Sequence, residues 1–346
     1  MKGSVIALDE IAGRKAAARI IDGQLDDLLI DPAPEDATPR PGAIYRAICD
    51  RPVKGQGGMF VRLPEVSGYL RQAQGLKPGA AVLVQVTGWA EPGKAVPLTA
   101  KVLFKSRYAI ITPGAPGINL SRRIHDEEER VRLLDIAHEA AGEAGETGLI
   151  LRSEAVEGDD AAVADDIAAM HELARAVAAD ADGRAPDLLV DGPDAHLLAW
   201  RDWAAPDQFD DTPGSFARHG ADEMIAALRA SLAPLPGGAF AHIEPTRALV
   251  AVDVNTGDDT SPAAGLKANI ALARALPRLL RCKGLGGQIT LDLAPMPKKD
   301  RRGFEQALRA AFRTDPIETA LAGWTPLGHF EMQRKRERRP LEEALG

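Results

Sequence analysis

Two acidic side chains in apolar runs carry the strongest chemical signal in this sequence. Asp253 follows residues 249–252 and stands two positions before Asn255, and Asp292 follows residues 289–291. Such runs predict buried strands, where an unpaired carboxylate is costly unless a cation or a positive side chain accompanies it. Carboxylate oxygens suit Mg²⁺, which keeps water and phosphate as further ligands. The pattern predicts phosphate chemistry, and its alternative is that these aspartates cap turns or pair with arginine.

The segment between the two runs predicts a helix that positions them. Ser261-Pro262 supplies a helix start, Pro277 should kink the helix, and Gly284 should end it. The expected apolar face consists of Leu266, Ile270, Ala273, Leu276 and Leu280. Strand, helix and strand together predict a right-handed parallel unit with both carboxylates at one edge of a sheet.

Length and composition set the class of protein. The chain has 346 residues and 45% hydrophobic residues, which predicts two or three domains with real cores. No apolar run approaches the roughly 18 residues that span a bilayer, and the start lacks a signal-peptide pattern, so we expect a cytoplasmic protein without a membrane partner. Cys49 and Cys282 form no CxxC pair, which argues against a disulfide framework or a cysteine zinc site.

Charge is unevenly distributed along the chain. The formal net charge is -8, yet residues 126–223 hold 26 acidic and 7 basic side chains, which leaves 24 acidic and 35 basic ones elsewhere. The basic clusters are Lys101, Lys105 and Arg107; Arg122-Arg123; Lys298-Lys299 with Arg301-Arg302; and Arg334-Lys335-Arg336 with Arg338-Arg339. Any one cluster alone is interpreted as solvated surface, but together with the two aspartates the clusters favour a polyanionic partner.

The order of predicted elements gives the layout. Short strands at 4–8, 17–21 and 28–30 surround the turn Asp22-Gly23, and a proline-rich linker follows at 31–41. Evenly spaced short strands then predict a small β-barrel between 42 and 105. Beyond it, helices are expected at 126–141 and 161–179, with a strand at 148–151 between them.

Six sequence blocks, in order, resemble the ribonuclease E/G family across nearly the whole chain. The blocks are IDGQ at 21–24, NLSRRI at 119–124, GLILRS at 148–153, LVAVDVNT at 249–256, LGGQITLD at 285–292 and LGHFEMQR at 327–334. The resemblance implies a short ribonuclease G-like member: a magnesium-dependent endoribonuclease that cleaves single-stranded RNA by metal-activated attack of water and leaves 5′-phosphate ends, in rRNA and mRNA processing and decay.

The resemblance also implies an α/β multidomain fold. It comprises RNase H-like and DNase I-like α/β subdomains, an inserted S1-like OB-fold β-barrel and an α+β 5′-sensor insert. The implied boundaries are 1–40 for the first RNase H-like part, 41–106 for the barrel, 107–186 for the sensor insert, 187–236 for the second RNase H-like part and 237–346 for the DNase I-like catalytic domain.

Roles for the catalytic residues follow from the resemblance. Asp253 and Asp292 are expected to hold Mg²⁺, and Asn255 to orient the ion or the scissile phosphate. Arg334 matches an arginine whose guanidinium would clamp a phosphate, and its alternative is an ion pair with Glu331.

RNA-binding and sensing residues are implied in the same way. Phe60 and Tyr69 match positions where bases stack, with core packing as the alternative, and Lys94 and the pair Arg122-Arg123 are expected to contact phosphates. A 5′-monophosphate sensor is expected at Ser106, Ile110, Arg152 and Ser153. Its alternative is that Arg152 pairs with the acidic segment 126–223.

The chain departs from the family pattern in two places. No cysteine pair follows the block at 327–334, so we expect any homo-oligomer to form without a zinc bridge, and no C-terminal scaffold is expected. Pro295 stands where the family tends to have a further carboxylate, which leaves one fewer carboxylate near the metal.

None of the seven histidines forms an HxH or HxxxH pair. We interpret them as structural or surface residues, and His329 is the one nearest a functional block.

Two other functions remain open at this point. One is a catalytically weak RNA-binding protein of the same architecture, and the other is a metal-dependent phosphoesterase acting on small nucleotides. The sequence leaves open the RNA targets, the cleavage consensus, the oligomeric state and the strength of 5′-end dependence.

Overall fold

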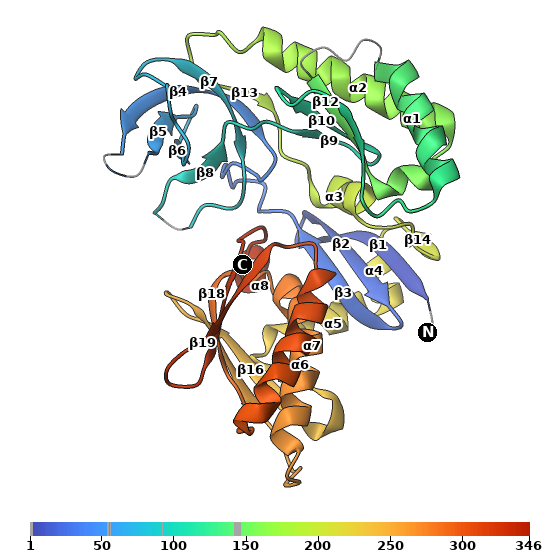
Figure 1. Ribbon diagram of the computed structural model, residues 1–346, viewed down its shortest axis with the longest axis vertical. Helices are drawn as coiled ribbons and strands as arrows, with labels where there is room; N and C mark the ends of the chain where they lie inside the picture. The colour runs from blue at the N-terminus through green and yellow to red at the C-terminus, as the bar shows by residue number, and fades with distance from the viewer. Residues whose placement is uncertain (1–2, 54, 56, 92, 142–146) are drawn as a thin grey trace. The chain divides into compact units, whose positions relative to one another are not determined.

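The computed structural model describes residues 3–53, 55, 57–91, 93–141 and 147–346 (Figure 1). The fold mixes α-helices and β-sheets in two compact units. Unit 1 joins residues Met1–Asp36 to Ala205–Gly346, and unit 2 is the segment Ala37–Ala204 between them. The predicted α/β class is confirmed, whereas the five finer domain boundaries stay predictions.

Unit 1 begins with a small sheet. Its strands, in the order β14-β1-β2-β3, are β14 (Gln208–Asp210), β1 (Ser4–Ile11), β2 (Arg14–Ile21) and β3 (Gln24–Ile30). The predicted turn Asp22-Gly23 joins β2 to β3, and both residues have positive φ, as a tight hairpin requires. Helices α4 (Ser215–His219) and α5 (Ala221–Arg229) bury Phe216 and Ile225 against this sheet.

The larger sheet of unit 1 has the order β15-β16-β17-β18-β20-β19. These strands are β15 (Leu232–Pro234), β16 (Phe240–Pro245), β17 (Val250–Asn255), β18 (Gly287–Asp292), β20 (Phe330–Arg334) and β19 (Thr319–Trp324). Helices α6 (Ala264–Cys282) and α7 (Arg301–Arg313) pack on one face through Leu272, Leu276 and Phe304. Short helices η2 (Pro236–Gly238), η3 (Lys298–Asp300) and α8 (Leu341–Leu345) complete the unit.

Helix α6 connects the two strands that carry the aspartates. It begins at Ala264, just after the expected start at Ser261-Pro262, and continues through Pro277 to Cys282. Gly284 follows with φ +65°, and a side chain there would collide with the carbonyl oxygen of Arg339. The prediction that Gly284 ends the helix is therefore confirmed.

Unit 2 contains a closed five-stranded β-barrel. The strands β4 (Ile44–Pro52), β5 (Met59–Arg62), β6 (Ser67–Leu70), β8 (Val96–Thr99) and β7 (Ala81–Val86) pair in that order, and a β4–β7 pairing closes the ring. Val61, Val84 and Leu98 are among its buried residues. The predicted barrel is confirmed and is consistent with an OB fold. Strand β13 (Asp187–Val190) adds to β4.

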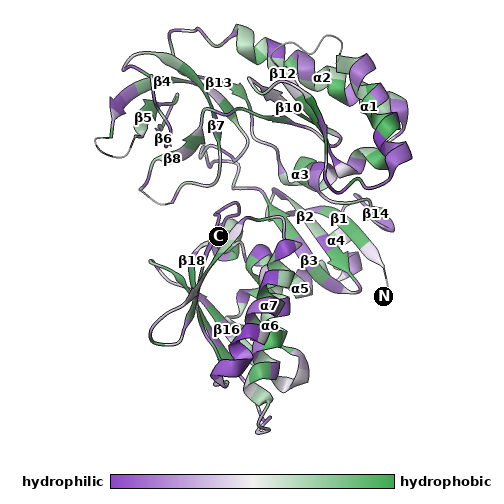
Figure 2. Ribbon diagram, viewed as in Figure 1, coloured by the Kyte–Doolittle hydropathy of each residue, from purple (hydrophilic) through white to green (hydrophobic). Residues whose placement is uncertain are grey.

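A second sheet in unit 2 carries the acidic helices. Its strands, in the order β11-β12-β10-β9, are β11 (Ile118–Leu120), β12 (Thr147–Leu151), β10 (Ala109–Pro113) and β9 (Phe104–Lys105). Helices α1 (Glu127–Ala141) and α2 (Asp160–Ala179) match the predicted helices and alternate hydrophobic with hydrophilic residues (Figure 2). Leu133 and Ile167 are fully buried in the shared core. The segments η1 (Ser153–Val156) and α3 (Ala195–Asp202) follow β12 and β13.

No helix in the described part of the chain is long and apolar enough to cross a bilayer. Both cysteines, Cys49 and Cys282, are buried and free. Burial raises the pKa of the Cys282 thiol to about 12, which keeps it protonated and inert.

Candidate active site on the open face of the larger sheet

Asp253 and Asp292 occupy facing positions on two neighbouring strands. Strands β17 and β18 run parallel, and their register pairs Val250 with Ile289 and Asp253 with Asp292. Since adjacent strands lie about 5 Å apart, side chains at paired positions on one face are immediate neighbours. The prediction that the two carboxylates meet on a parallel pair is confirmed.

The two aspartates are exposed, which corrects the sequence-based expectation of buried charges. Burial alternates along both strands, so that Val252, Val254 and Leu291 face the helices while Asp253 and Asp292 face solvent. The side chain of Asp292 is 66% exposed. Because α6 and α7 pack on one face of the sheet, the strands alternate in the manner of a half-buried sheet. What favours a cation here is therefore the proximity of two like charges rather than their burial.

Two polar side chains lie beside the pair. The amide of Asn255 donates to Oδ2 of Asp253 at 3.4 Å, and Nδ1 of His329 lies 3.4 Å from Oδ1 of Asp292. Within the residues that the structure describes, no three His, Cys, Asp or Glu side chains are grouped so that they could hold a metal ion. The site thus offers two carboxylates and one amide, which is a donor set for an ion that keeps water in its coordination shell.

Helix α6 fixes the segment that follows Asp292. The fully buried side chain of Asn269 donates to the carbonyl oxygen of Ala294 at 2.9 Å and accepts from the Ala294 amide at 3.0 Å. A Cβ at Gly265 would lie 2.0 Å from the carbonyl oxygen of Pro295. These two contacts hold the end of β18 against the start of α6, and neither residue was singled out by the sequence pattern.

Arg334 lies elsewhere, so the structure does not support its predicted role as a phosphate clamp beside the aspartates. It pairs in register with Gly287, at the opposite end of β18 from Asp292, which is a separation of roughly 17 Å along the strand. Its side chain is fully buried and donates to Asp315 at 2.5 Å and to the Thr319 hydroxyl at 2.9 Å. The alternative ion pair with Glu331 is not formed either.

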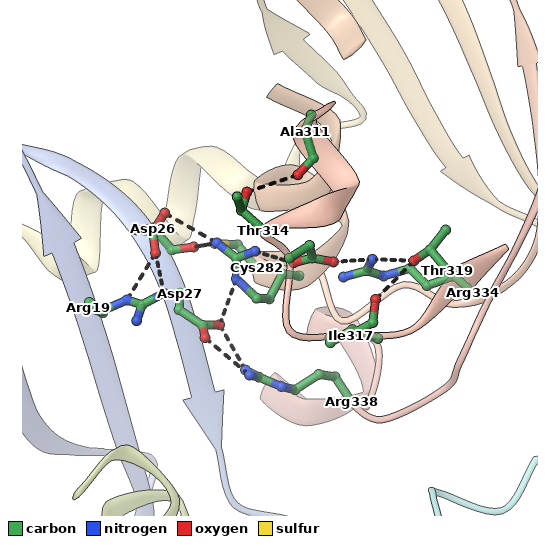
Figure 3. A network of polar contacts seen from close by, with 12 residues as sticks. Arg19, Asp26, Asp27, Cys282, Ala311, Thr314, Ile317, Thr319, Arg334 and Arg338 are labelled. Atoms are coloured by element: carbon green, nitrogen blue, oxygen red, sulfur yellow. Dashed lines mark hydrogen bonds and ion pairs between the residues drawn. The ribbon is translucent and has the colours of Figure 1, made fainter. Parts of the chain in front are cut away.

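Arg334 belongs to a buried ionic network within unit 1 (Figure 3). Arg281 connects Asp315 to Asp26 and Asp27, and Arg338 also pairs with Asp27. Burial would raise the pKa of the Asp27 carboxyl, but Arg338, Arg281 and Arg19 outweigh it and lower that pKa. Arg339 pairs with Asp36 at 2.5 Å. Much of the C-terminal basic cluster is therefore structural, which corrects its interpretation as a contact for a polyanion.

The two barrel aromatics lie together on adjacent strands. Phe60 and Tyr69 face each other in the β5–β6 register, with ring centroids 5.5 Å apart, and Arg51 lies over the Phe60 ring at 5.1 Å. A Cβ at Gly58 would lie 2.4 Å from the Tyr69 hydroxyl, so the Tyr69 ring occupies the space that glycine leaves. Both rings are half-buried, as is suitable for stacking a base.

The predicted phosphate contacts of unit 2 are solvent-exposed. Lys94 lies in the turn before β8 and pairs with Glu91 at 3.0 Å. Arg122 and Arg123 follow β11 and are exposed. Their roles stay predictions.

Comparison with known proteins identifies the family of this chain. The model of the Ribonuclease E/G family matches residues 104–211 and 207–337. Ribonuclease E of Nostoc sp. is 30% identical over 88% of this chain and 52% of its own length. Ribonuclease E of Synechocystis sp. is 29% identical over 83% of this chain and 48% of its own, and Ribonuclease G of Escherichia coli K12 is 29% identical over 85% and 66%.

The chain belongs to the ribonuclease E/G family. It spans between about half and two thirds of the length of these relatives. The family resemblance predicted from the sequence blocks is confirmed, and both aspartates lie within the matched region.

The residues predicted to form the ribonuclease E/G 5′-sensor converge, but their charges are already paired. Arg152 donates to the carbonyl oxygen of Ser106 at 2.5 Å and to Asp202 at 3.0 Å, and its side chain is 12% exposed. Ser106 is buried, and its hydroxyl donates to Asp166 at 2.5 Å. Ser153 bonds to Glu154, and Ile110 lies half-buried on β10.

Asp202 is the carboxylate at the centre of this sensor cluster. It accepts from Arg152 and Arg201 and pairs with Lys105 at 2.7 Å. Burial would raise the pKa of its carboxyl, but Arg201 and Lys105 hold it at about 2. An ionised carboxylate therefore neutralises the cations that a 5′-phosphate would need. This is the alternative in which Arg152 pairs with the acidic segment 126–223, to which Asp202 belongs.

Sequence reasoning missed the neighbours of Asp253 on β16. His242 pairs in register with Asp253, and Phe240 pairs with Asn255. The signal was present in the alternation of residues 240–244, where Ala241 and Ile243 are the buried positions.

Proposed function

We propose that this chain is a magnesium-dependent endoribonuclease that cleaves single-stranded RNA and leaves 5′-phosphate ends. The observation that carries the proposal is the register of Asp253 with Asp292 on an open sheet face, in a chain of the ribonuclease E/G family. The names of the relatives, Ribonuclease E and Ribonuclease G, say that those proteins cleave RNA. We extend the proposal for this chain to roles in RNA processing and decay.

The donor set fits Mg²⁺. Two neighbouring carboxylates provide hard oxygen ligands, and their exposure leaves room for water and a phosphate oxygen. When bound, the ion would offset charge that develops on the phosphate and favour attack by water. Asp253 and Asp292 would hold the ion, Asn255 would orient Asp253, and Asn269 would keep the end of β18 in place.

The barrel supplies a means of binding the substrate. Phe60 and Tyr69 present two adjacent half-buried rings, and stacking of bases on such rings tolerates any sequence. We propose that this S1-like barrel binds single-stranded RNA, and that the RNase H-like and DNase I-like assignments describe the small and the larger sheet of unit 1.

The test is cleavage of an A/U-rich single-stranded oligonucleotide. Wild-type protein with Mg²⁺ is expected to cut it, and EDTA to stop the reaction. Asp253→Asn and Asp292→Asn should each lower the rate by roughly a hundredfold or more, because each replaces a charged metal ligand with a weaker, neutral one and so removes a charge that acts on the transition state. Mapping of the product ends checks for 5′-phosphates.

Glu244→Gln is the matched control. Glu244 is an exposed carboxylate on β16 whose register partner is Ala251, two residues along the strand from Asp253. It should leave the rate unchanged. Equal losses in all three variants, or undiminished cleavage by Asp253→Asn, would show that the aspartate pair does not carry the activity.

A catalytically weak RNA-binding protein is the second candidate. It is favoured by the finding that, in the described residues, no third His, Cys, Asp or Glu side chain is grouped with the pair so that the three could hold a metal ion. In that case the oligonucleotide would bind in a manner that depends on Phe60 and Tyr69 and would remain uncut with Mg²⁺ present.

A further inference from the structure

An apolar strip lies beside the carboxylate pair on the same face of the sheet. The strip consists of Leu232 and Pro234 on β15 and Phe240 and His242 on β16. The intervening residues Ala233, Ala241 and Ile243 are buried on the helix side, so the strip faces solvent. Leu232 is 44% exposed, although it is a large aliphatic residue. Exposed apolar surface of this kind marks a binding surface when it is contiguous.

The strip shares its rows with the candidate active site. One row across the sheet runs Leu232, His242, Asp253, Asp292, and the next runs Pro234, Phe240, Asn255. Because each step between strands is about 5 Å, the rings of Phe240 and His242 lie one strand away from Asp253 and Asn255. The strip therefore borders the acidic surface of Asp253 and Asp292, and the distance between them is about the size of a single nucleotide.

The rings of the strip are held in place. Phe240 and His242 contact edge to face, with centroids 5.7 Å apart, and the Ser231 hydroxyl lies 3.3 Å from Nδ1 of His242. Both rings are half-buried. By contrast, the ring cluster of Phe304, Trp324 and Phe330 lies against the core side of the sheet. Two fixed rings beside the carboxylates provide a surface for a ligand with an apolar, planar face.

We propose that this strip binds a nucleobase of the RNA substrate, next to the phosphate that is cleaved, and contributes to the choice of cleavage site. The inference rests on the proposed function and deepens it. Unpaired bases stack on Phe and His rings, whereas the phosphate groups between them need a cation. On this face of the sheet, the rings lie on β16 and the two carboxylates that would hold a cation lie on β17 and β18. The base would lie over β15–β16 and the phosphate over Asp253 and Asp292.

An abasic substrate tests the strip directly. A fluorescent oligonucleotide with one cleavage site is compared with versions that lack a single base at each position around that site. Wild-type protein should cleave one abasic version roughly 5- to 100-fold less efficiently than the parent, mainly through KM. In the Phe240→Ala/His242→Ala double variant, parent and abasic substrates should be cleaved with equal efficiency.

Phe209→Ala is the matched control, since Phe209 is 52% exposed on β14 of the other sheet in unit 1. It should retain the wild-type discrimination. Leu232→Ala and His242→Ala, each of which truncates a side chain on the open face, should reduce the discrimination even if the double variant fails to fold. Retention of full discrimination by both single variants would overturn the proposal.

A binding measurement separates this inference from the proposed function. Fluorescence anisotropy in EDTA at moderate salt compares binding of the parent and abasic oligonucleotides without cleavage. Loss of base-dependent binding in the strip variants supports the strip even if wild-type protein cuts no RNA. Base-dependent binding that is the same in wild type and variants would place the base elsewhere and refute the strip.

Discussion

Two groups of charged residues in unit 1 differ in whether their charges are compensated by neighbouring side chains. On the open face of the larger sheet, Asp253 and Asp292 stand side by side, and no Lys or Arg forms an ion pair with either among the described residues. In the buried network (Figure 3), Asp315 lies between Arg281 and Arg334 and forms an ion pair with each. All three side chains are buried. The two aspartates on the open face therefore favour binding of a cation, whereas in the buried network the charges of the side chains compensate one another.

The difference shows which charged residues are free to act on a ligand. A buried ion pair holds its partners so firmly that a phosphate would have to replace a carboxylate at a high desolvation cost. Arg334 matched a family motif, yet it belongs with the balanced group. In unit 2, Arg152 is paired in the same manner, with Asp202 as its counterion.

The largest expected effect on stability comes from the balanced network. Asp315→Ala would leave Arg281 and Arg334 buried without their shared carboxylate, and should lower the free energy of unfolding by about 3–5 kcal/mol. Asp253→Asn, which relieves a repulsion at the surface, should change it by less than about 0.5 kcal/mol. Urea unfolding measures both, and similar losses in the two variants would remove the distinction between the groups.

A smaller effect should come from the support of the open pair. Asn269→Ala leaves the Ala294 amide and carbonyl without their partner and should cost about 1–3 kcal/mol of stability. Displacement of the end of β18 should also lower kcat roughly tenfold or more, with KM little changed. Gln333→Ala, an exposed change on β20, is the control. If kcat of folded Asn269→Ala equals that of wild type, Asn269 does not position Asp292.

The smallest expected effect is on how strongly the cleavage rate depends on the 5′-end of the RNA. Because Asp202 already neutralises Arg152 and Lys105, wild-type protein should cleave 5′-monophosphate and 5′-hydroxyl substrates at similar rates. Asp202→Asn should free these cations and produce a severalfold preference for the 5′-monophosphate. Asp187→Asn, which changes an exposed carboxylate that pairs with Arg46, should not produce this preference. A strong 5′-monophosphate preference in the wild type would mean that the phosphate displaces Asp202.

The same carboxylate predicts a pH dependence of stability. Since the pKa of Asp202 falls from its ordinary value near 4 to about 2 on folding, its contribution is complete above about pH 4 and is lost as the pH falls toward 2. Acid unfolding of the Asp202→Asn variant should lack this component.

Local patterns predicted much of the fold. The alternation and turns of residues 4–30, the even spacing of barrel strands and the alanine-rich helices all have short-range causes, and each element was found near its expected place. Asp253 and Asp292 were also predicted to meet, because a strand, a helix and a strand form a parallel pair.

The rest depended on contacts that no local pattern contains. Whether the aspartates face a core or solvent is set by which face α6 and α7 cover, and the apolar runs alone suggested burial on both faces. The partner of Arg334 is Asp315, which lies in a loop without a distinctive motif. His242 joins the Asp253 row only through the β16–β17 register.

The parallel register of β17 and β18 also guards against misfolding. A slip of one residue in either strand would turn its aspartate toward Leu272 and Leu276 of the helix layer, where a bare carboxylate is strongly disfavoured. Correct pairing is therefore favoured by the very groups that the proposed chemistry uses. Replacement of both aspartates would therefore remove, together with the proposed metal ligands, a constraint on the alignment of two hydrophobic strands.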